Sequence, residues 1–114
     1  MEFAKLIRNK REEKGLTVRA LERMLHERSA GPAISRTLIS YLETGDRVPT
    51  YDVAYAIADV LEIDMINTIR AAYLARLKHG QDRESRYVRE FLDRAGLELN
   101  PDILTRAKRS RSAQ

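Results

Sequence analysis

The sequence of 114 residues contains no cysteine, and aromatic residues make up only 6% of it. The absence of cysteine excludes disulfides and thiolate metal sites, and it fits a reducing cytosol. No apolar run approaches the roughly 20 residues that a membrane span needs. The first residues also lack the basic segment and apolar core of a secretory signal. These absences predict a cytoplasmic protein with no membrane partner.

Catalytic motifs are missing as well. The sequence has no phosphate-binding glycine loop, no dinucleotide fingerprint, and no serine or cysteine nucleophile motif. No spacing of Asp or Glu suggests acid–base catalysis, and His26 and His79 are too far apart to suggest a metal site. We therefore predict that the protein is not an enzyme and that it needs no cofactor or metal.

The charge is unevenly distributed along the chain. The formal net charge is +4, from 21 basic and 17 acidic residues. Residues 1–64 hold 10 Lys or Arg and 11 Asp or Glu, whereas residues 65–114 hold 11 and 6. A basic balance favours an anionic partner. Since the first half is nearly neutral, it can bind nucleic acid only by placing its basic side chains on one face.

The hydrophobic pattern predicts an all-α protein, because apolar residues recur at helical spacing and no strand pattern or internal repeat appears. Capping and breaking residues separate the segments, among them Gly31-Pro32 and the pair Asn100-Pro101. Helices are expected at about 3–14, from 18 to before Gly31, at 35–44, 50–61, 65–79 and 82–95, and in a short segment from Asn100. The basic tail at 110–114 is expected to be frayed.

The segment from Ser35 to Gly45 carries the clearest functional signal. Ser35 can cap the start of a helix and Gly45 can end it. Leu38, Ile39 and Leu42 form one buried stripe. The opposite face carries mostly short hydrogen-bonding side chains, namely Arg36, Thr37, Ser40, Tyr41 and Thr44. Such a face is suited to lie against a polar surface and to form specific hydrogen bonds with it.

Residues 3–64 resemble the phage repressor/Cro-like helix-turn-helix family, also called XRE or lambda-repressor-like. The resemblance rests on residues 11–17 at the end of the first helix, on Leu21, and on Ile39, Leu42, Glu43 and Gly45 in the third. It continues in the following helix at Pro49, Thr50, Val53, Ile57, Ala58, Leu61 and Ile63. The resemblance implies a five-helix DNA-binding domain at 1–64. Residues 65–109 lie outside the resemblance, and their own pattern predicts additional C-terminal helices.

Two features depart from the family pattern. The connection between the second and third helices is longer than usual, and the excess includes residues 26–34. The family also often has Gln where this chain has Val18, which cannot donate a side-chain hydrogen bond to a phosphate. The insertion can lie on the DNA backbone, contact a second subunit, or be a simple loop.

The resemblance also implies roles for individual residues. The helix at 35–44 would enter the major groove, with Arg36, Thr37, Ser40 and Tyr41 as candidates for base contacts. Phosphate contacts are expected from Thr17, Arg19, Arg28, Thr44 and Arg47. For each of these residues the alternative is an ordinary exposed polar side chain. Arg11 and Glu43 are expected to form a buried ion pair with a structural role, so neither is assigned to DNA.

A single helix-turn-helix buries little surface, so members of the family usually form dimers. We expect a homodimer contact through Ile66, Ile69, Tyr73 and Leu77. The alternative is that these side chains complete the core of a monomer. The function expected is a transcriptional regulator, most simply a repressor, that binds double-stranded DNA at a palindromic operator in the nucleoid. Rival interpretations are an antitoxin whose C-terminal helices bind a protein partner, and a sensor that binds a small ligand.

Overall fold

The computed structural model describes residues 2–28, 31–80 and 85–94, and within them it contains six α-helices and no strand. The helices are α1 (Phe3–Glu13), α2 (Val18–Glu27), α3 (Arg36–Thr44), α4 (Tyr51–Leu61), α5 (Met65–Lys78) and α6 (Ser85–Arg94). The prediction of an all-α fold is confirmed. The predicted helix at 82–95 is Ser85–Arg94 among the described residues, and the segments predicted from Asn100 onward lie outside them.

Hydrogen bonds from the sequence's own capping residues set where the helices begin. The side chains of Thr17, Ser35, Thr50 and Asp64 each accept a hydrogen bond from the amide three residues later. Each of these interactions satisfies one of the amides that a helix start leaves without a partner. The fold therefore starts four of its helices at positions that the sequence alone identifies.

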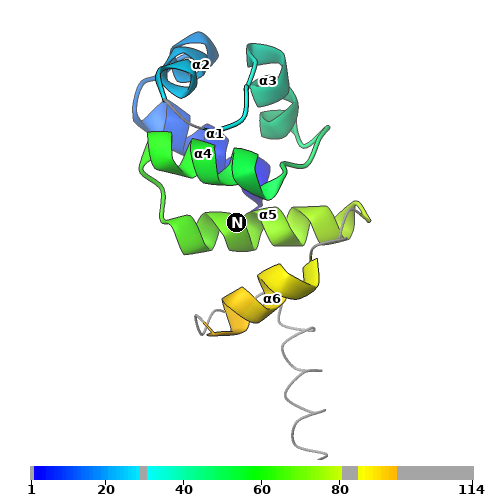
Figure 1. Ribbon diagram of the computed structural model, residues 1–114. Coiled ribbons are helices and arrows are strands. Elements are labelled where there is room, and N and C mark those ends of the chain that lie inside the picture. The colour runs from blue at the N-terminus through cyan, green and yellow to red at the C-terminus, as the bar shows by residue number, and fades with distance from the viewer. Residues whose placement is uncertain (1, 29–30, 81–84, 95–114) are drawn as a thin grey trace, which may run out of the picture.

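The helices form successive layers, which Figure 1 shows from one side. α2 and α3 lie at one end, α1 and α4 lie beneath them, and α5 crosses under α4. The main core joins these helices through fully buried side chains, chiefly Ile7, Leu21, Ile39, Leu42, Ile57 and Leu61. Because Ala71 and Ala72 of α5 also belong to this core, α5 is the fifth helix of one packed unit, and the core continues across residue 64.

The far side of α5 is covered by α6. Tyr73 and Leu92 are buried at 3% and 0% exposure and form the centre of a second, smaller apolar cluster. Ile66, Ile69 and Leu77 pack around that centre. The four side chains predicted for a dimer contact therefore lie within one chain, between α5 and α6, as the alternative of a completed monomer core describes.

Part of the insertion belongs to the core. Ile34 is only 2% exposed and packs in the main cluster together with Leu25 and Ile39. It directly precedes the cap Ser35, and Ile39 is the fourth residue of α3, so the two stand at the positions of a hydrophobic staple. The insertion is therefore fixed at its end, and Ile34 sets the direction in which the chain enters α3.

Candidate nucleic-acid interface

α3 presents one buried face and one exposed face. Ile39 and Leu42 are fully buried, so the inner face is held against the core. Ser35 accepts a hydrogen bond from the Leu38 amide at 3.1 Å at the start of the helix. Gly45 ends the helix with a φ of 83°, which favours glycine. The exposed face carries all the predicted contact residues of this helix, namely Arg36, Thr37, Ser40, Tyr41 and Thr44.

Arg11 and Glu43 join α1 to α3. Arg11 donates from Nε to Glu43 Oε2 at 2.7 Å and from Nη2 to Oε1 at 2.9 Å. Arg11 also donates from Nη1 to the Leu16 carbonyl oxygen at 2.7 Å. The hydrogen bonds to Glu43 raise the pKa of Arg11, against the lowering effect of its burial. Both side chains are largely buried, so the pair holds α3 against α1.

A second contact joins α2 to the first turn of α3. The Arg36 amide donates to Glu22 Oε2 at 2.7 Å, and Arg36 Nε lies 3.4 Å from Glu22 Oε1. Glu22 thus satisfies a helix-start amide that Ser35 does not reach, and it also pairs with the Arg36 guanidinium. This contact could not be predicted from the sequence, because the two residues are 14 positions apart across a connection of unusual length.

The C-terminal end of α3 carries a second polar group. The Arg47 guanidinium lies 5.0 Å from the centre of the Tyr41 ring, which is the geometry of a cation–π interaction. The Thr44 hydroxyl donates to Asp46 Oδ2 at 2.8 Å. Arg47 therefore carries an exposed positive charge beside α3, whereas the hydroxyl proton of Thr44 is engaged within its own turn.

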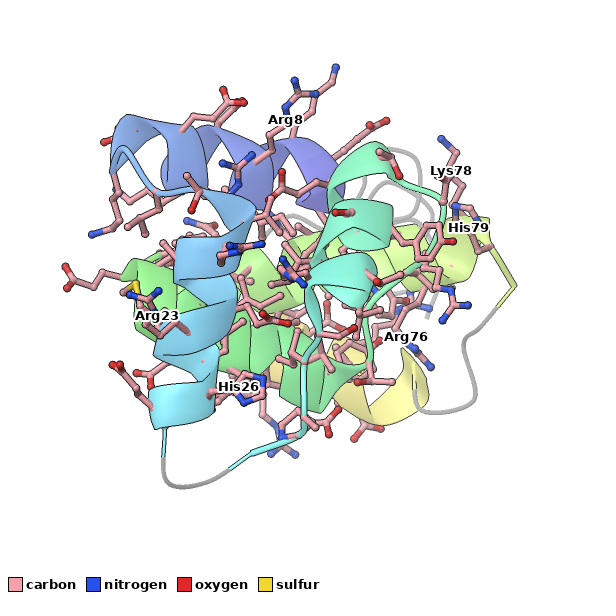
Figure 2. The ribbon with its side chains drawn as sticks, turned by 90° about the horizontal axis from the view of Figure 1, so that it is seen from above. Arg8, Arg23, His26, Arg76, Lys78 and His79 are labelled. Carbon is pink, nitrogen blue, oxygen red and sulfur yellow. The ribbon has the colours of Figure 1, made fainter. Side chains whose placement is uncertain are left out.

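The N-terminal end of α2 offers further candidates for phosphate contact. Thr17 accepts a hydrogen bond from the Ala20 amide at 3.0 Å, which caps the helix. Arg19 is exposed and makes no ion pair with any described residue. Figure 2 looks down on α2 and α3, and it shows Arg23 projecting from the outer side of α2. Arg19 therefore gives the exposed surface a positive charge on the α2 side, whereas Arg23 points away from α3.

Arg28, the predicted phosphate contact in the insertion, is directed to α4. Its Nε donates to Asp59 Oδ2 at 3.0 Å, and its guanidinium lies 5.9 Å from the centre of the Tyr55 ring. The side chain is 21% exposed. Arg28 could bind a phosphate only if both contacts broke, or if its guanidinium bound Asp59 and the phosphate at the same time.

The described residues show neither a metal-binding cluster nor a membrane-spanning helix. Within 2–28, 31–80 and 85–94, no three His, Asp or Glu side chains gather as ligands for a metal ion. In the same ranges no helix is both long and apolar enough to cross a membrane.

Comparison with known proteins agrees with this geometry. A helix-turn-helix family model matches residues 7–66, more than half of the chain and the part that contains α2 and α3. Among curated proteins and solved structures, the searches found no match. The matched family is one of DNA-binding regulatory domains of the XRE type. The chain therefore belongs to the XRE-type, Cro/lambda-repressor-like helix-turn-helix family, and it is a DNA-binding transcription regulator.

Proposed function

We propose that this protein is a sequence-specific repressor that binds a palindromic operator as a homodimer in the cytoplasm, with α3 in the major groove. The observation that carries the proposal is the division of α3 into two faces. Its apolar side is fixed in the core, and its exposed side is a continuous row of short polar residues with Arg36 at the N-terminal end. A helix that enters the major groove contacts base edges mainly with its N-terminal residues.

The residue types on α3 suit the acceptors and donors of the major groove. Arg36 can donate two hydrogen bonds to O6 and N7 of a guanine, and Thr37 can contact a thymine methyl group. Ser40 and Tyr41 lie further along the same exposed face, where they reach a neighbouring base or phosphate. When Arg36 binds a base, its guanidinium must either break its contact with Glu22 or keep that contact, in which case Glu22 holds the guanidinium in position.

Phosphate contacts are proposed for the residues around α3. Thr17 and Arg19 lie at the start of α2, and Thr44 and Arg47 lie at the end of α3, so they flank the reading face on both sides. Such contacts fix the register of the protein on DNA and supply much of its affinity. Arg28 and Thr44 are weaker candidates, because Asp59 and Tyr55 already bind Arg28 and the Thr44 hydroxyl already donates to Asp46.

The surface expected from the sequence for the homodimer is already partly engaged within one chain. Ile66, Ile69, Tyr73 and Leu77 are packed beneath α6. The outer side of α6, in contrast, carries Phe91 at 51% exposure. We therefore place the dimer contact on that side of α6, where a second copy would cover Phe91.

The first experiment is selection of bound duplexes from random DNA, with the mass of the protein measured in the same buffer. We expect one palindromic motif to be enriched and a mass of two chains. Arg36→Ala with Thr37→Ala should abolish the enrichment, since each bidentate base contact is worth about 1–3 kcal/mol of discrimination. Arg23→Ala, from the outer side of α2, is the control and should keep the motif. A folded protein that enriches no sequence would contradict the proposal and favour a protein-binding role.

A second experiment separates the two arginines proposed for phosphate contact. The logarithm of the DNA-binding constant falls with the logarithm of salt concentration by about 0.9 for each neutralised phosphate. Arg47→Ala should reduce this slope by about 1, whereas Arg28→Ala should leave it nearly unchanged because Asp59 already neutralises Arg28. Equal changes in slope for the two variants would show that Arg28 leaves Asp59 to bind DNA.

A further inference from the structure

A groove of about 570 Å³ lies beside the C-terminal end of α3. It is bounded by the start of α1, the connection between α3 and α4, and the last turns of α5. Leu42, Pro49, Ala71 and Leu74 contribute to its apolar lining. Its volume is that of an ordinary small-molecule site, for which 300–1,000 Å³ is typical.

The rim of the groove is mostly basic. Of the described residues that line it, Arg47, Lys78 and His79 are basic and only Glu2 is acidic. None of the three basic residues makes an ion pair with a described residue, although Arg47 lies over the Tyr41 ring. Figure 2 shows Lys78 and His79 at the end of α5, next to the chain that leaves α3. The charge of the rim is thus available to a ligand.

We propose that this groove binds a small amphipathic anion, an aliphatic carboxylate with a chain of medium length. The apolar lining removes the chain from water, at about 25 cal/mol for each Å² buried. The carboxylate stays at the open rim, where Lys78 and Arg47 stabilise its charge. An apolar ligand without charge would leave the basic rim unused, and a cationic one would be repelled by it.

The position of the groove links it to DNA binding, a step that rests on the proposed function. Leu42, Thr44 and Gly45 line the groove and also form the end of α3. Arg47 belongs both to the rim and to the proposed phosphate contacts. A carboxylate that draws Arg47 into the groove removes it from the DNA backbone. By thermodynamic linkage, DNA and the carboxylate then weaken each other's binding by the same factor.

Calorimetry on the full chain tests the ligand with three probes. Octanoate should bind one to one, whereas acetate lacks the chain, octylammonium has the opposite charge, and neither should bind. Lys78→Glu should weaken octanoate binding several-fold, and Lys5→Glu, the same change on α1 outside the groove lining, should leave it unchanged. Ala75→Phe should block the groove. If the Ala75→Phe variant fails to fold, the Lys78→Glu variant still tests whether octanoate binds there. Equal binding of octylammonium, or of octanoate to the Lys78→Glu variant, would overturn the proposal.

The same samples then test the link to DNA. Octanoate should raise the dissociation constant of the selected duplex about tenfold, within the usual range for coupled sites, and acetate at equal concentration should not. Octanoate that binds the protein but leaves DNA binding unchanged would overturn the link. A protein that binds octanoate but selects no DNA sequence would contradict the proposed function alone, since the calorimetric result does not depend on DNA.

Discussion

Replacing Arg11 with alanine is expected to lower the free energy of unfolding by about 3–5 kcal/mol, the range for breaking a buried ion pair. The side chains of Arg11 and Glu43 are only 14% and 7% exposed. The substitution therefore leaves the Glu43 carboxylate away from water with no partner for its charge, and it removes the donor to the Leu16 carbonyl. Urea denaturation followed by circular dichroism measures the change.

The surface of α1 supplies a matched control. Arg8 pairs with Glu12 at 3.1 Å, but the two side chains are 58% and 54% exposed, so Arg8→Ala should change stability by less than about 1 kcal/mol. Arg11→Met combined with Glu43→Leu should recover most of the loss, because apolar replacement of a whole buried pair is often neutral. Similar destabilisation by Arg8→Ala and Arg11→Ala would contradict this account of the pair.

The pH dependence of this contribution follows from the sign of the pKa shift. The pair raises the pKa of Arg11 in the folded protein. Its stabilisation is therefore complete below the ordinary pKa of arginine and declines only as the pH rises through the raised value. No loss is expected from Arg11 at any pH used to measure DNA binding.

Replacing Leu92 with alanine is expected to cost about 2–5 kcal/mol, as large-to-small changes in a core do. Leu92 is fully buried and shares the centre of the second cluster with Tyr73. Because only partly buried side chains such as Tyr51 and Ile69 join this cluster to the main core, we expect the loss to detach α6 before the rest of the protein unfolds. Hydrogen exchange should show early exchange of the α6 amides while α1 to α4 keep their protection.

The neighbouring residue on α6 serves as the control for this experiment. Phe91 is 51% exposed, so Phe91→Ala should leave the exchange of the α6 amides in the monomer nearly unchanged. The same variant should weaken the homodimer if the outer side of α6 is the contact. Loss of protection throughout α1 to α6 on Leu92→Ala would show that the two clusters unfold together, contrary to our expectation.

Local chemistry made much of the fold predictable from the sequence. Thr17, Ser35, Thr50 and Asp64 act as helix caps in the structure, and Gly45 ends α3 as expected. These signals depend on atoms a few residues apart, so the sequence shows them directly. The exposed face of α3 was predictable for the same reason, since helical spacing alone separates it from Ile39 and Leu42.

Contacts between distant segments were harder to predict. Arg28 was expected to face DNA, yet its partner Asp59 lies 31 residues away on α4. Tyr73 was expected at a surface because nothing in α5 shows that α6 folds back over it. Ile34 was the exception that the sequence could have revealed, because an apolar residue directly before the cap Ser35 is a known staple position.

The contact between Glu22 and Arg36 has a consequence for how the protein would search DNA. Non-specific binding comes almost entirely from attraction between basic side chains and phosphates. In the free protein Arg36 Nε lies 3.4 Å from the Glu22 carboxylate. Contact between Arg36 and a phosphate therefore adds little to the free energy of non-specific binding. A guanine that accepts two hydrogen bonds offers Arg36 a better partner. If α3 binds an operator as proposed, Glu22 would thereby shorten the time spent at wrong sequences and sharpen the choice of operator without touching a base.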